Sequence, residues 1–190
     1  GEASRMGDLV EDLLLLARLD EHRPLRRDLV DLRALLEDAA RDARVLQPDR
    51  SVTVEVPASV PLVIEGDAYR LEQVIGALVH NALAYTEPVA GLVLGASIAD
   101  GAATIVVADA GPGMDAEAAD RVFDRFVRGE TSRSRSSGGA GLGLSIAQAI
   151  VEAHGGTITL ATAPGAGCRF TIMLPFDQPA DGLTPGGAPA

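Results

Sequence analysis

Lysine is absent from this chain of 190 residues, and all 16 of its basic residues are arginine. The absence excludes the P-loop and the protein-kinase type of ATP site, because each of these places a lysine against the phosphates. It also excludes Schiff-base catalysis, which needs a lysine amine. A nucleotide phosphate would therefore have to be held by backbone N–H groups, a metal ion and arginine.

Aromatic residues and cysteine are also scarce. Aromatic residues make up 3% of the chain, so the core must be built mainly from Ala, Val, Leu and Ile. Cys168 is the single cysteine and has no partner for an internal disulfide, which fits a reducing compartment. The formal net charge of −11 disfavours nucleic acid as a partner, and no apolar run reaches membrane-spanning length.

Helical and strand-like apolar patterns alternate along the chain. Helical spacing predicts helices near 3–20, 32–46, 68–84 and 142–153. Alternating or β-branched runs predict strands near 28–30, 52–56, 62–64, 91–99, 103–109, 157–160 and 168–174. The strands come in pairs with helices between them. This order predicts an α+β fold, a two-layer α/β sandwich with a mixed sheet and helices on one face.

Asn81 lies in an apolar helical stretch, on the same predicted face as Ala77 and Ala84. A neutral oxygen ligand in such surroundings suits Mg²⁺ that is also held by phosphates and water. Taken alone, a buried asparagine bonded to the backbone is the simpler explanation.

Asp109 follows a β-branched strand and precedes Gly111 and Gly113. A carboxylate there would accept a hydrogen bond from the adenine amino group and repel the oxygen of guanine, and the glycines would allow a tight turn. An ordinary aspartate-containing turn has the same pattern, so this segment is weak evidence by itself.

Residues 110–140 form a long polar stretch that ends at Gly139, Gly141 and Gly143, where a helix begins. Such stretches in compact domains are usually functional lids, and a helix N-terminus favours phosphate. A flexible hinge would show the same glycines. The arginines of this stretch are the mobile positive charges available to a triphosphate, although a solvated basic loop explains each of them equally well; they are Arg125, Arg128, Arg133 and Arg135.

Four segments, taken in order, resemble the catalytic ATP-binding domain of bacterial sensor histidine kinases, within the Bergerat-type ATPase superfamily. They correspond to the N box (78–86), the G1 box (109–114), the F box (123–126) and the G2 box (139–146). Each box is weak alone, but four in this order with a lid between two of them are highly specific, and the resemblance covers residues 26–176.

The resemblance implies ATP and Mg²⁺ as cofactors and gives roles to single residues. Asn81 matches the Mg²⁺ ligand, Tyr85 the aromatic residue against the base, and Asp109 the adenine-reading aspartate. Asn81 and the lid residue Arg128 are the candidates for catalysis. The remaining nucleotide-binding candidates belong to the two glycine-containing boxes: Gly111, Gly113, Gly139, Gly141, Leu142, Gly143 and Leu144.

The resemblance also implies a domain organisation. Residues 1–20 match the C-terminal part of the second helix of a dimerisation and phosphoacceptor hairpin, 21–27 a linker, 28–176 the ATP-binding domain and 177–190 a disordered tail. No histidine here has an acceptor-like context, so we expect this chain not to autophosphorylate by itself. Its implied partners are its own hairpin in a homodimer and a response regulator. The implied location is the cytoplasmic side of a bacterial protein anchored in the membrane by earlier segments.

Two positions depart from the family pattern. Ala77 stands where asparagine is frequent, and Ala84 stands where lysine or arginine is frequent. They imply weaker ATP affinity or greater reliance on the lid arginines. Two alternatives stay open: another Bergerat-type ATPase or anti-sigma kinase, and a degenerate module that binds a nucleotide or a partner without catalysis.

Overall fold

The computed structural model describes residues 25–57, 61–99, 101–127 and 140–176, together with residues 7, 10 and 14–17. The helix expected over 3–20 is represented only by its described residues, which are helical. The expected tail 177–190 lies outside the described residues. No helix in the described part of the chain is long and apolar enough to cross a membrane.

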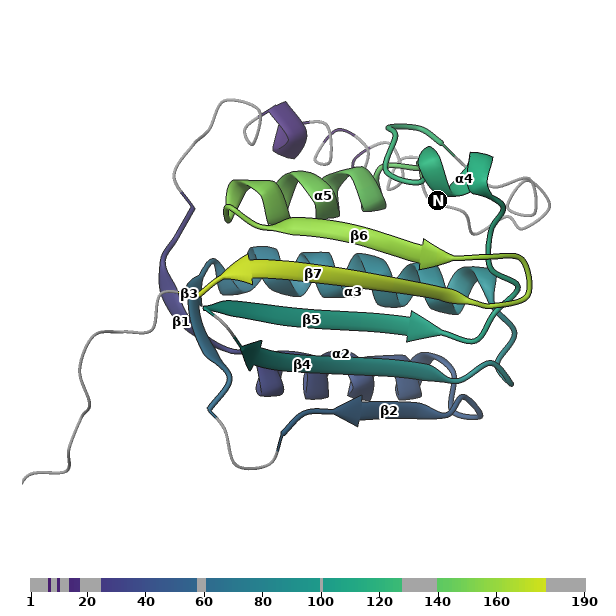
Figure 1. Ribbon diagram of the computed structural model, residues 1–190, viewed down its shortest axis with the longest axis horizontal. Helices are drawn as coiled ribbons and strands as arrows, with labels where there is room; N and C mark the ends of the chain where they lie inside the picture. Colours follow the sequence, from purple (N-terminus) through teal and green to yellow (C-terminus); the bar gives the residue numbers. More distant parts are fainter. Residues whose placement is uncertain are drawn as a thin grey trace, which may run out of the picture.

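The main sheet has five strands in the order β2-β4-β5-β7-β6 (Figure 1). Its members are β2 (Val52–Glu55), β4 (Leu92–Ala99), β5 (Ala102–Asp109), β6 (Thr157–Thr162) and β7 (Cys168–Pro175). β2 pairs with β4 in parallel, and all other neighbours are antiparallel. The expected mixed sheet is therefore confirmed.

The three longer helices cover one face of this sheet, as the sequence predicted (Figure 1). They are α2 (Leu32–Leu46), α3 (Ala68–Tyr85) and α5 (Gly143–Ala153), and a short helix α4 (Ala116–Asp120) lies within the polar stretch 110–140. Aspartates begin two of them: the Asp31 carboxylate accepts from the N–H groups of Arg33 and Ala34, and that of Asp67 accepts from Arg70.

Two further strands, β1 (Asp28–Asp31) and β3 (Val63–Gly66), form a separate antiparallel sheet. The sequence placed a short strand at each position but did not reveal that they pair with one another. The prediction that β3 ends at Ile64 was wrong, because its pairing with β1 continues to Gly66, opposite Asp28.

The core lies between the main sheet and the helices. In β4, Leu92, Leu94 and Ala96 are buried toward the helices, and the alternate residues face the open side. Leu15 and Leu16, from the helical residues near the N-terminus, belong to the same buried cluster.

Candidate functional site

The α3 helix presents the predicted asparagine along the margin of its buried face. Ala77, Asn81 and Ala84 are all half-buried, whereas Leu78 and Ala82 between them are buried. Tyr85, at the last turn of α3, is also half-buried. Asn81 and Tyr85 are therefore not sealed in the core, and both side chains remain open to a ligand.

Asp109 is the last residue of β5, and its carboxylate accepts a hydrogen bond from the turn that follows it. The Gly111 N–H donates to Asp109 Oδ1 at 2.9 Å. A Cβ atom at Gly111 would collide with the methyl group of Thr86, the residue that ends α3. The end of the N box and the G1 box are thus in van der Waals contact, and only glycine fits at their junction.

The electrostatics of Asp109 are unusual for an aspartate. Burial raises the pKa of its carboxyl above the ordinary value, although the N–H groups of Gly111 and Cys168 and the charge of Arg50 act in the opposite direction. Desolvation disfavours the ionised form of this carboxyl. The two N–H donors and the positive charge of Arg50 favour the ionised form and so oppose that effect. An ionised carboxylate is purely a hydrogen-bond acceptor, as an adenine amino group requires.

Gly113 continues the G1 turn with a φ of 66°. A Cβ atom there would collide with the carbonyl oxygen of Ala163, in the β6–β7 connection. The following N–H, of Met114, donates to Thr162 Oγ1 at 3.0 Å. These contacts hold the G1 turn against the β6–β7 hairpin.

The G2 box places the start of α5 beside α3. A Cβ atom at Gly143 would lie 3.9 Å from the Ala77 Cβ, so the two helices approach closely where two small residues meet. Leu142 occupies the N-cap position of α5 and provides no side-chain cap. The first backbone N–H groups of α5 therefore have no side-chain cap, which leaves them available to an anion.

The F box connects the two ends of the lid. Phe123 packs edge-to-face on Phe170 of β7, with ring centroids 6.2 Å apart. The Phe126 N–H donates to the Gly141 carbonyl oxygen at 2.9 Å, and Gly141 has a φ of 76°. The described ends of the segment predicted to be a lid therefore meet at Phe126 and Gly141, beside α5. The predicted lid residues Arg128 and Gly139 lie outside the described residues.

Sequence reasoning missed Arg50, which is a charged residue of the core with a side chain only 3% exposed. Its guanidinium contacts Thr86, the residue that touches Gly111. A lone arginine after Pro48-Asp49 shows no periodicity, and apart from Gln47 its side-chain partners lie 36 to 40 residues away in the chain. Nothing local distinguishes it from a solvated turn residue.

The donor set fits Mg²⁺ only as an ion shared with a nucleotide. Among the described residues, no group of three or more His, Cys, Asp or Glu could hold a metal ion. The amide oxygen of Asn81 is a hard neutral ligand, and Mg²⁺ commonly keeps water and phosphate oxygens in its coordination shell.

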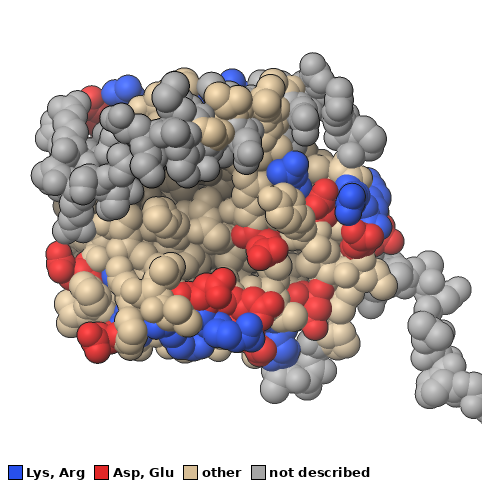
Figure 2. Space-filling model, turned by 180° about the vertical axis from the view of Figure 1, so that it is seen from behind, with Lys and Arg blue, Asp and Glu red and all other residues tan. Residues whose placement is uncertain are grey.

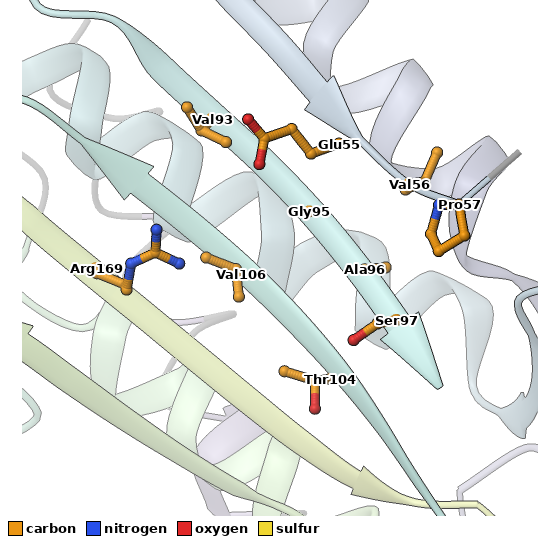
Figure 3. Close-up of a pocket in the computed structure, with 10 residues that line it drawn as sticks. All are labelled: Glu55, Val56, Pro57, Val93, Gly95, Ala96, Ser97, Thr104, Val106 and Arg169. Atoms are coloured by element: carbon orange, nitrogen blue, oxygen red, sulfur yellow. The ribbon is translucent and has the colours of Figure 1, made fainter. Parts of the chain in front are cut away.

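A depression of about 500 Å³ lies elsewhere, on the open face of the main sheet. Figure 3 shows Gly95 and Val106 within it, with Glu55 on one side and Arg169 on the other. On the helical face, seen in Figure 2, charged side chains gather along the lower edge and at the right of the view, and uncharged residues fill most of the area between them. The depression on the open face includes none of the predicted nucleotide-binding residues.

Comparison with known proteins gives one family. Residues 66–178 match the family described as "Histidine kinase-, DNA gyrase B-, and HSP90-like ATPase". The chain is 47% identical over 178 residues to the probable sensor histidine kinase TcrY of Mycobacterium tuberculosis, covering 93% of this chain and 37% of that protein. It is 35% identical to the histidine-protein kinase BaeS of Escherichia coli, covering 38% of its length. The chain thus spans less than two fifths of these relatives.

Solved structures agree with the sequence comparison. The crystal structure of full-length ShkA in complex with AMPPNP superposes with a TM-score of 0.77 at 32% identity, covering 92% of this chain and 37% of that one. The histidine kinase AdeS of Acinetobacter baumannii superposes with a TM-score of 0.75 at 25% identity, covering 93% of this chain and 81% of that one.

Proposed function

Because the chain belongs to the histidine kinase-, DNA gyrase B- and HSP90-like ATPase family, as the ATP-binding catalytic domain of a sensor histidine kinase, we propose that its site between α3, the end of β5 and the start of α5 binds Mg-ATP. The observation that carries this assignment is the convergence of the boxes. Thr86 meets Gly111, and Ala77 meets Gly143, so the N box contacts both glycine-containing turns.

Within this site, Asp109 accepts a hydrogen bond from the adenine amino group, and Tyr85 lies against the base. Gly111 and Gly113 shape the turn beneath it. The phosphates are held by the loop from Gly139 to Leu144, with Gly141, Leu142 and Gly143 supplying backbone N–H groups at the start of α5. Asn81 would hold Mg²⁺, which neutralises phosphate charge when bound.

The reaction we propose for the whole protein is transfer of the ATP γ-phosphoryl group to a histidine. That histidine belongs to a phosphoacceptor hairpin, of which residues 1–20 are the end, and a response-regulator aspartate then receives the group. Such transfer depends mainly on positioning and charge stabilisation. Asn81 and the lid residue Arg128 supply these together. The hairpin dimer and the membrane anchor belong to the same proposal.

Calorimetric titration with Mg-ATP tests the site. We expect binding of Mg-ATP but not of Mg-GTP, and loss of Mg-ATP binding in Asp109→Asn, whose amide replaces one acceptor oxygen by a donor. Equal affinity for both nucleotides, or an Asp109→Asn variant that binds ATP like the wild type, would show that Asp109 does not read the base.

A degenerate, non-catalytic module remains the second candidate, because Ala77 and Ala84 remove polar groups from the half-buried face of α3. Mixing the chain with a separately produced hairpin that carries an acceptor histidine distinguishes the two. A kinase forms acid-labile phosphohistidine from labelled ATP, and an Asn81→Ala variant does not. ATP binding without any transfer to the hairpin would favour the degenerate module.

A further inference from the structure

Arg50 is a buried cation whose five N–H groups all have partners. Nε donates to Gln47 Oε1 at 2.7 Å, and Nη1 donates to Thr86 Oγ1 at 2.7 Å and to the Ala90 carbonyl at 2.9 Å. Nη2 donates to the carbonyls of Thr86 at 2.9 Å and Glu87 at 3.0 Å. A guanidinium has five N–H donors, so this side chain is fully satisfied without a direct carboxylate partner.

These bonds fix one short segment of the chain. Residues 86–90 connect the end of α3 to β4, and three of their carbonyl oxygens and one hydroxyl accept from Arg50. The backbone on either side is bonded too: the Leu92 N–H donates to the Ser51 carbonyl at 2.8 Å, and the Ala110 N–H donates to the Gly91 carbonyl at 3.3 Å. Arg50 thus anchors the connection that lies between the N box and the G1 box.

Thr86 transmits this anchoring to the aspartate. Its hydroxyl accepts from Arg50 and donates to the Ala82 carbonyl at 2.6 Å, so its rotamer is fixed. With the hydroxyl held, the methyl group faces Gly111 at a distance that leaves no room for a Cβ atom. Gly111 in turn donates its N–H to Asp109.

Arg50 also acts on Asp109 through its charge. The pKa of the Arg50 guanidinium is lowered by burial, and the negative charges of Asp109 and Glu87 oppose this. The groups that face Asp109 are Arg50 from the α2–β2 connection, the Gly111 N–H from its own turn and Cys168 from β7. Arg50 is the cation among them, and burial raises the pKa of the Cys168 thiol, which therefore adds no negative charge beside Asp109.

We propose that Arg50 is a positioning residue for nucleotide binding, which holds Thr86 against the Asp109–Gly111 turn and keeps the Asp109 carboxylate in its acceptor form. The inference rests on the proposed role of Asp109 as the adenine-reading residue. Arg50 acts on the nucleotide indirectly, through Thr86 and Asp109.

The test compares Arg50→Gln, Arg50→Lys and Arg41→Gln. Arg41, in α2, is the matched control, because its side chain is 67% exposed and pairs with the exposed Asp38. The Asp109 carboxyl is titrated by carbon-detected NMR in the nucleotide-free protein. In Arg50→Gln the pKa of Asp109 is expected to rise, since the opposing positive charge is gone. Arg50→Lys and Arg41→Gln should stay near the wild type.

Mg-ATP affinity is then measured from pH 5.5 to 8, and the affinity of each variant is divided by that of the wild type at the same pH. Protonation of the nucleotide affects both affinities equally and therefore cancels in this ratio. Arg50→Gln should bind about tenfold more weakly at pH 7, with the deficit growing as the pH falls. Arg50→Lys should lose affinity by a constant factor, because an ammonium cannot make all five bonds. An unchanged Asp109 pKa together with an unchanged affinity ratio in Arg50→Gln would overturn the proposal.

A milder variant, Thr86→Val, keeps the test decisive if Arg50→Gln does not fold. It removes the hydroxyl that fixes the rotamer but leaves the charge of Arg50, so affinity should fall several-fold while the pKa of Asp109 stays near the wild type. Wild-type affinity in Thr86→Val would exclude transmission through this side chain. If Asp109→Asn binds ATP normally, the adenine assignment fails, whereas the Asp109 titration still reports whether Arg50 controls the carboxylate.

Discussion

At the scale of single residues, the nucleotide site depends on the absence of a side chain at position 111. A methyl group added there would collide with Thr86 and lie 2.8 Å from Asp109 Oδ1. We expect Gly111→Ala to weaken Mg-ATP binding about tenfold and to cost about 1–3 kcal/mol in the free energy of unfolding, as overpacking usually does. Calorimetry and urea denaturation measure the two effects.

Gly76 is the matched control for this substitution. It is an exposed residue of α3, and a Cβ atom there would meet nothing within 4 Å. Gly76→Ala should therefore increase the free energy of unfolding by about 0.5–1 kcal/mol, because alanine is the better helix former. Similar behaviour of the two alanine variants would contradict the steric argument at Gly111.

The contribution of Asp109 to the stability of the protein should change with pH. Its folded-state pKa is raised, chiefly by burial, so the neutral carboxyl is favoured on folding. This contribution is fully present below the unfolded pKa and is lost as the pH rises through the folded pKa. Relative to the wild type, Asp109→Asn should therefore gain thermal stability as the pH rises above about 4, the ordinary pKa of an aspartate, since it has no such loss. A constant difference in melting temperature across that range would contradict the raised pKa.

The same residues show what a sequence can predict. Asp31 and Asp67 were identifiable as helix starts because a capping carboxylate bonds to N–H groups two or three residues away. The network of Arg50 was not identifiable, because it joins residues 36 to 40 positions apart and no local pattern records such contacts.

At the scale of elements, the helices and the main strands were predictable from apolar periodicity, whereas the pairing of the strands was only partly so. Asp-Gly pairs favour tight hairpin turns, and Asp100-Gly101 is the pair that stands between β4 and β5 in the sequence. The parallel pairing of β2 with β4 and the separate β1–β3 sheet join strands that are distant in sequence. The alternation of apolar and polar residues shows which side of a strand faces the core, but it does not show which strand lies beside it. These pairings could therefore not be predicted from the sequence.

The F box should act as the fixed base of the lid. Phe123 packs against Phe170, and three residues later the Phe126 N–H donates to the Gly141 carbonyl oxygen. Phe123→Leu keeps an apolar side chain but loses the edge-to-face contact, which is worth about 0.5–1.5 kcal/mol. We expect faster proteolysis between residues 127 and 140 and weaker binding of Mg-ATP, with adenosine binding nearly unchanged, because adenosine has no phosphates for the lid to contact.

Phe126→Gly is the control for the lid prediction. Phe126 is 58% exposed and has a φ of 66°, which glycine adopts without strain. This variant should keep the stability of the wild type. Equal loss of adenosine and Mg-ATP binding in Phe123→Leu would instead show a general collapse of the domain rather than a loosened lid.

At the scale of the whole molecule, His154 joins the two helices that bear the site. The Asp67 N–H, at the start of α3, donates to His154 Nε2 at 3.0 Å, so the proton of the neutral ring lies on Nδ1, 2.8 Å from the Ile150 carbonyl. Sequence reasoning can place an imidazole at a helix end as a cap for carbonyl oxygens, and His154 has that role at the end of α5. The sequence did not predict the bond to Asp67, 87 residues earlier in the chain.

This link lies at the far ends of both helices from the nucleotide-binding residues, because Asn81 belongs to the C-terminal part of α3 and Gly143 begins α5. We therefore expect His154→Ala to lower the free energy of unfolding by about 1–2 kcal/mol, through two lost hydrogen bonds and an unpaired N–H. Mg-ATP affinity of the folded protein should stay within about twofold of the wild type, since no site contact changes. Urea denaturation and calorimetry on one preparation measure both, with exposed Glu152→Ala as the control on the same helix. Full stability in His154→Ala would show that the link is dispensable, whereas a large loss of affinity would mean that the far ends of α3 and α5 govern how their near ends hold the nucleotide.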